Sequence, residues 1–135
     1  MLPFEFVVTG SPISLQTNNR VLLQSWKTKV RQAAISRLPI GTVPTIESVQ
    51  IIIIHYYAAS PPDIDNIAKP ILDALNLLVY IDDKQITDLT LRRRSLRNLS
   101  KTQNLPDVVA EALAKNEPFI YVKIDTSPNV TELSL

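Results

Sequence analysis

Alternating apolar and polar positions predict strands at the two ends of this chain. Phe4, Phe6 and Val8 occupy every second position near the N-terminus, and residues 119–125 alternate in the same way. Residues 48–57 contain a continuous apolar and aromatic run, which is typical of a strand covered on both faces. A further strand is expected within residues 86–96, which brings the expected number to about four.

Helical spacing of apolar residues predicts three helices between these strands. Residues 22–38 form the first, and its expected inward positions are Leu22, Trp26, Val30, Ala33 and Ala34. The inward stripe of the second is Ile67, Ile71, Ala74, Leu75 and Leu78. Asn66 is its expected N-cap and Pro70 its expected first-turn proline. A short third helix should follow Pro106, with Val109, Ala112 and Leu113 directed inward.

The predicted order of elements is β-α-β-α-β-α-β. This order is typical of a single α/β domain, here a mixed sheet of about four strands packed with helices. The 135 residues fit one domain, expected over residues 1–126, with residues 127–135 as a flexible tail.

Composition excludes several kinds of site. The chain has no cysteine, so disulfides, zinc–thiolate sites, iron–sulfur clusters and cysteine nucleophiles are ruled out, and its one histidine rules out a site that needs two imidazoles from one chain. The longest aliphatic run, Ile51–Ile54, is far shorter than a membrane span, and the N-terminus does not resemble a signal peptide. We therefore expect a cytoplasmic protein with no membrane partner. His55 follows four isoleucines and is expected to have no catalytic part.

The net charge of +1 hides a strong segregation of charge. Residues 6–46 carry five basic residues and no acid, residues 63–88 carry six aspartates against two lysines, and residues 89–106 carry five basic residues and no acid. A divalent cation would offset the acidic centre, and the basic flanks are suited to phosphates. Solvated charged faces of ordinary helices and strands are the alternative interpretation.

The acidic centre contains two closely spaced pairs of aspartates. Asp63 and Asp65 are two residues apart in what should be extended chain, so their side chains should point the same way. Asp82 and Asp83 follow the second helix and can return to the same end of the domain. Carboxylates without histidine or cysteine are the hard ligands that Mg²⁺ or Mn²⁺ prefers, and Lys69 lies one helical turn after Asp65.

Simpler roles exist for each of these aspartates. Asp63 could form a turn, Asp65 could cap the helix or pair with Lys69, and Asp82–Asp83 could be a plain turn. An EF-hand loop does not fit, because its fifth and sixth positions would be Ile67 and Ala68. A phosphate-binding glycine loop needs more than the two glycines present, and a haloacid-dehalogenase-like fold is larger than this chain.

Three motifs together resemble the RusA family of Holliday-junction resolvases. They are Asp63-x-Asp65-Asn66-x-x-Lys69, Asp73-Ala74-Leu75 and Asp82-Asp83-x-Gln85-Ile86. A weaker similarity to the N-terminal region of that family is the segment Thr17-Asn18-Asn19-Arg20, which precedes a basic helix. The resemblance implies a homodimeric, magnesium-dependent crossover-junction endodeoxyribonuclease of DNA recombination and repair, which nicks two strands of a four-way junction.

The resemblance also implies roles for individual residues. Asp63, Asp65 and Asp83 would be catalytic carboxylates that bind Mg²⁺, with Mn²⁺ as a substitute, and Asp82 is a further candidate ligand. Lys69 would be the catalytic lysine. We interpret Asn66 as a helix cap or as a donor that orients a carboxylate.

Contact with DNA is expected from basic residues on both sides of the acidic centre. Residues 58–62 are neutral where the family representative carries arginines, and the pI is only 8.0. The candidates are Arg20, Lys27, Arg31, Lys84, Arg92, Arg94, Arg97 and Lys101. Strand alternation should separate Arg92 and Arg94 from Arg93. Two other functions stay open: a non-catalytic module that binds branched DNA and holds a structural metal, and a nuclease for another branched substrate.

Overall fold

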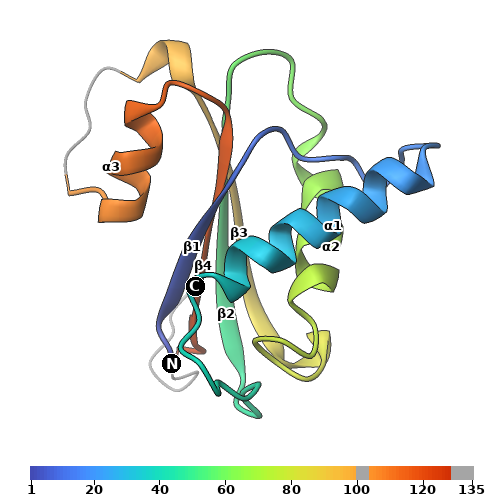
Figure 1. Ribbon diagram of the computed structural model, residues 1–135, viewed down its shortest axis with the longest axis vertical. Helices are drawn as coiled ribbons and strands as arrows, with labels where there is room; N and C mark the ends of the chain where they lie inside the picture. Colours follow the sequence, from blue (N-terminus) through green and yellow to red (C-terminus); the bar gives the residue numbers. More distant parts are fainter. Residues whose placement is uncertain (100–103, 129–135) are drawn as a thin grey trace.

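Four strands form one mixed sheet in the order β1-β4-β2-β3 (Figure 1). The computed structural model describes residues 1–99 and 104–128. β4 pairs antiparallel with both β1 and β2, whereas β2 and β3 are parallel. The elements along the chain are β1 (Phe4–Thr9), α1 (Arg20–Ile35), β2 (Val49–Tyr57), α2 (Ile64–Leu75), the 3-10 turn η1 (Asp83–Gln85), β3 (Ile86–Ser95), the 3-10 turn η2 (Leu96–Asn98), α3 (Asp107–Ala114) and β4 (Phe119–Thr126). The predicted α/β class and the four-stranded sheet are confirmed.

The helices lie on both faces of the sheet. α1 and α2 pack together over one face, and α3 packs over the other (Figure 1). The parallel β2–β3 pair requires a crossover connection, and α2 provides it. This topology places the acidic residues before and after α2 next to the α1–α2 face of the sheet.

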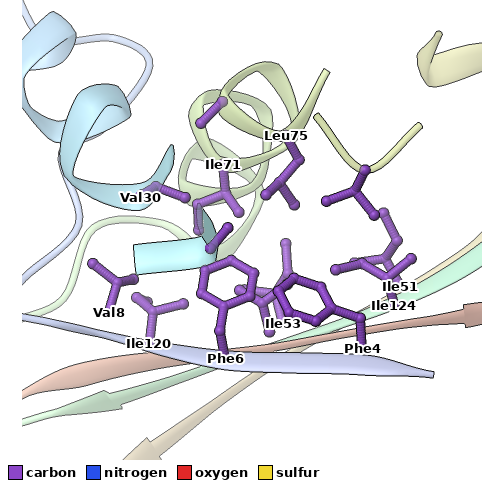
Figure 2. Close-up of a cluster of buried hydrophobic side chains, with 14 of the residues drawn as sticks. Phe4, Phe6, Val8, Val30, Ile51, Ile53, Ile71, Leu75, Ile120 and Ile124 are labelled. Carbon is purple, nitrogen blue, oxygen red and sulfur yellow. The ribbon is translucent and has the colours of Figure 1, made fainter. Parts of the chain in front are cut away.

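The larger core lies between this face and the two helices. Figure 2 shows Phe4 and Phe6 of β1 and Ile53 of β2 pointing toward Ile71 and Leu75 of α2. Alternate strand residues supply one wall of this core, as the apolar pattern predicts. The fully buried aliphatic and aromatic side chains hold α2 at a fixed height above the sheet.

α1 begins two residues earlier than predicted, because the side chain of Asn19 accepts a hydrogen bond from the Leu22 amide at 3.0 Å and caps the helix. The prediction that Leu22 points inward is wrong. Leu22 is 45% exposed and Leu23 is buried in its place, since the first turns of α1 project beyond the sheet (Figure 1). Trp26 and Val30 are buried as predicted.

The predicted start of α2 is also wrong. Asp63, not Asn66, is the N-cap residue, and Pro70 lies inside the helix rather than in its first turn. Proline has no amide hydrogen to donate to the Asn66 carbonyl one turn earlier. The Leu15 amide donates to that carbonyl instead, at 3.0 Å, so the helix tolerates the proline because the segment before α1 replaces the missing bond.

A second apolar cluster lies under α3. Val108, Val109 and Ala112 are buried there against Tyr56 and Phe119, which stack with ring centroids 4.5 Å apart. The prediction of a short helix after Pro106 is therefore confirmed. Within the described residues, no helix has the length and hydropathy needed to cross a membrane.

Candidate active site

Lys69 joins helix α2 to the acidic turn that carries Asp83. Its Nζ lies 2.9 Å from Oδ1 of Asp73, one turn further along α2, and 3.5 Å from Oδ2 of Asp83 in η1. The hydrogen bond and the charge of Asp73 are the main causes that raise the pKa of Lys69, and Asp83 adds to them. Lys69 is therefore a protonated cation near neutral pH, in contact with one carboxylate of its own helix and one of the η1 turn.

The turn that carries Asp83 is fixed by a capping box. Asp82 accepts a hydrogen bond from the Lys84 amide, and Oε1 of Gln85 accepts from the amides of Ile81 and Asp82. The bond from the Lys84 amide is the main cause that lowers the pKa of Asp82. The Asp82 carboxylate is thus engaged in the turn, whereas the adjacent Asp83 points to Lys69.

Gln85 also ties this turn to the loop before β2. Its Nε2 donates to the carbonyls of Thr45 and Glu47, both at 2.8 Å. Tyr80 is fully buried just before the turn, and its hydroxyl donates to the Leu72 carbonyl of α2 at 2.7 Å. Sequence reasoning assigned no role to either residue, although Gln85 was part of a motif, because Gln85 acts on a loop 38 to 40 residues away and Tyr80 acts on the backbone of the helix before it.

Asp63 and Asp65 lie at the N-terminus of α2. The expectation that both occupy extended chain is wrong, since Asp63 is the N-cap residue and Asp65 is already helical. Both side chains are exposed. Asp65, Lys69 and Asp73 follow one another at four-residue spacing and so share one face of the helix. Asp65 is thereby one helical turn from the lysine that contacts Asp83.

The carboxylates do not form a closed cage. Over residues 1–99 and 104–128, no group of three aspartate, glutamate or histidine side chains is close enough to hold a metal ion. The expected convergence of three or four carboxylates is therefore absent there, and Asp83 is paired with Lys69 instead. The donors still suit Mg²⁺ chemically, because Mg²⁺ in proteins commonly binds one or two carboxylates and completes its shell with water and substrate phosphates.

Two of the basic residues predicted to bind DNA are engaged between the helices. Lys27 of α1 lies 3.5 Å from Oδ2 of Asp73, and the Arg31 guanidinium donates to the carbonyls of Ala74 and Asn76 at the end of α2. These contacts cross the α1–α2 interface. The four groups Lys27, Asp73, Lys69 and Asp83 thus form a continuous chain of ion pairs.

The other DNA-binding candidates are spread over the surface. Arg20 at the start of α1, Lys84 in η1 and Arg97 in η2 are exposed. Lys101 lies outside the described residues. Lys84 is adjacent to Asp83 in sequence, so it is the candidate cation that borders the acidic site most directly.

The arginines of β3 lie on opposite faces of the sheet, as alternation predicts. Arg92 and Arg94 are in register with Ile54 and Tyr56 and so share the α3 face, whereas Arg93 is in register with His55 and faces the α1–α2 side. Sequence reasoning chose Arg92 and Arg94, although Arg93 shares its face with the acidic site. Alternation separates the two sets, but it does not say which set α2 covers.

This small α/β domain carries a lysine on its crossover helix, and acidic residues precede and follow that helix. Such a combination of charges is suited to phosphate chemistry. Residues 16–125 match the family described as Endodeoxyribonuclease RusA. The chain belongs to this endodeoxyribonuclease family, as the motifs predict. No curated protein is similar enough in sequence to be matched.

Proposed function

We propose that this protein is a magnesium-dependent endonuclease that resolves four-way DNA junctions as a homodimer, with one active site in each protomer. The observation that carries the proposal is the contact of Lys69 with Asp83, which joins the Asp82–Asp83 turn to the helix that begins at Asp63. Membership of a nuclease family supports the hydrolysis of a phosphodiester, and the acidic site supports a role for a divalent cation.

Of the exposed carboxylates Asp63, Asp65 and Asp83, one from each acidic segment would bind Mg²⁺, and water and substrate phosphate would complete its shell. Mn²⁺ would replace it because both ions prefer oxygen ligands. When bound, such an ion polarises the phosphate and lowers the pKa of water that attacks it. Asp82 is a less suitable ligand than Asp83, because the capping box fixes one of its oxygens on the Lys84 amide at 2.9 Å, whereas the contact of Asp83 with Lys69 is an exposed ion pair at 3.5 Å. This division of roles follows from the capping box.

Lys69 would stabilise the negative charge that develops on the phosphate oxygens as the bond to the leaving group breaks. Its ammonium contacts two carboxylates, but its side chain is 49% exposed, so it remains accessible to a DNA strand. Its raised pKa makes it a donor of hydrogen bonds rather than a general base. Asn66 lies beside Asp65, and its side-chain amide would serve as a neighbouring donor that orients a carboxylate.

The basic residues would hold the phosphates on either side of the cleaved bond. Each lysine or arginine that contacts a phosphate increases the dependence of binding on salt concentration. A dimer doubles the number of such contacts and matches the two strands that must be cut. Light scattering of the purified protein tests the dimer directly.

The function is tested by cleavage of synthetic DNA substrates. The wild-type protein is expected to cut a four-way junction into two nicked duplexes in Mg²⁺, to be inactive in EDTA, and to leave linear duplex uncut. Faster cleavage of a flap or a fork than of the junction would reassign the substrate. Binding of the junction without cleavage at any Mg²⁺ or Mn²⁺ concentration would identify a non-catalytic binding module and contradict the proposal.

A further inference from the structure

One carboxylate, that of Asp73, contacts a lysine from each of two helices. Oδ1 lies 2.9 Å from Nζ of Lys69 on α2, and Oδ2 lies 3.5 Å from Nζ of Lys27 on α1. Because both oxygens have partners, rotation of the carboxylate would break at least one contact. Asp73 is therefore oriented from α1 and in turn orients Lys69.

Exposure increases steadily along this chain of ion pairs. The side chains of Lys27, Asp73, Lys69 and Asp83 are 23%, 33%, 49% and 55% exposed, respectively. The inner end lies at the packed interface of α1 and α2, and the outer end faces solvent, where a DNA strand would bind. The arrangement extends the rigidity of the helix pair to an ammonium group at the surface.

Helix stability does not explain the charge at Asp73. The residue lies in the last turn of α2, where the helix dipole disfavours a negative charge. A lysine followed four residues later by an acid is also the weaker of the two orders for pairing along a helix. A negative charge at this position therefore does not stabilise α2 by itself. What the Asp73 carboxylate contributes is its contacts with Lys69 and Lys27.

We propose that Asp73 is a positioning residue that holds Lys69 toward the scissile phosphate, and that Lys27 fixes Asp73 from the neighbouring helix. The inference rests on the proposed function in one respect, which is that the group on which Lys69 acts is the scissile phosphate. Asp73 is the closer of the two partners of Lys69, at 2.9 Å against 3.5 Å for Asp83. Lys69 therefore stays oriented when the Asp83 carboxylate turns to another partner.

Junction cleavage by Asp73→Ala tests the role in catalysis. We expect kcat to fall about 10- to 100-fold, the range typical of groups that orient a site, with KM for the junction unchanged. Asp73→Asn should recover part of the loss, because its amide oxygen still accepts a hydrogen bond from Lys69. Lys27→Gln should lose less than Asp73→Ala. Glu111→Ala, an exposed carboxylate of α3 on the opposite face, is the matched control and should keep full activity.

A double-mutant cycle shows whether Asp73 acts through Lys69. In a Lys69→Gln background, measured with enzyme in excess over DNA, Asp73→Ala should cause no further loss of rate. Losses that multiply would overturn the inference, because Asp73 would then act independently of the lysine. Full activity of Asp73→Ala in the wild-type background would overturn it as well.

A second measurement separates this inference from the proposed function. The Nζ–H signal of the Lys69 ammonium in ¹H–¹⁵N spectra should persist in the wild type and in Glu111→Ala, and should be lost to exchange with water in Asp73→Ala. A signal unchanged by Asp73→Ala would show that Asp73 does not hold the lysine. If the wild type fails to cleave any branched DNA, the proposed function fails, and this signal alone decides whether Asp73 orients Lys69.

Discussion

Asp65→Asn is expected to reduce junction cleavage by about 10²- to 10³-fold, the loss typical when one group that stabilises the transition state is removed. Asparagine keeps the size of the side chain but removes the negative charge that would hold Mg²⁺. Asp65 is exposed and lies in the first turn of α2, so the change should leave the core intact. Binding of the junction should be unchanged or slightly tighter, since a negative charge beside the DNA is lost.

The rate is measured in Mg²⁺ on the same synthetic junction used for the wild type, and binding is measured in Ca²⁺ or EDTA. Glu111→Gln on α3 is the matched control, because it makes the same change from carboxylate to amide on the opposite face of the sheet. Cleavage by Asp65→Asn at the wild-type rate would remove Asp65 from the site. A parallel loss of binding would show that the residue holds the DNA rather than the cation.

The stability of the fold is expected to fall by up to about 3 kcal/mol between pH 6.5 and pH 4, through His55 alone. Burial, with a smaller effect from Arg93, lowers the pKa of His55 to about 4, against 6.5 for an unperturbed histidine. Below pH 6.5 the unfolded chain therefore binds a proton that the folded protein excludes. The free energy of unfolding decreases as the pH falls through this window and is insensitive to His55 above it.

His55→Phe separates this effect from the titration of carboxylates. His55 is 2% exposed, and in the described part of the chain its Nε2 has no hydrogen-bond partner, so an apolar ring removes both the titration and an unpaired polar atom. Urea denaturation at several pH values gives the free energy of unfolding of both proteins. Plotted against pH, the two free energies should run parallel above pH 6.5, and that of the wild type should fall more steeply below it. Parallel curves from pH 7 to pH 4.5 would contradict the prediction.

The strands were predictable because alternation is a local property of the chain. Phe4, Phe6 and Val8 of β1 need only one covered face to be buried together, and α1 and α2 cover that face. The place of Pro70 inside α2 was not predictable, because the helix tolerates it through the Leu15 amide, which replaces the bond that Pro70 cannot make. A contact between segments that far apart in sequence leaves no local pattern.

The candidate site was predictable in its residue types but not in its connections. The spacing of Asp65, Lys69 and Asp83 indicated a phosphate-directed site, and the structure joins the last two. The role of Asp73 was missed, because its contact with Lys27 links residues 46 positions apart on different helices. Charge patterning identified an acidic centre, whereas the orientation of each carboxylate depends on packing.

The central claim is that the two acidic segments bind one cation together. Broadening of backbone amide signals by substoichiometric Mn²⁺ in ¹H–¹⁵N spectra tests it most directly. Residues 64–66 and 83–85 are expected to broaden at the same Mn²⁺ concentration, and Asp83→Asn is expected to weaken the effect at both segments. Broadening confined to one segment, or unchanged at residues 64–66 in Asp83→Asn, would contradict it.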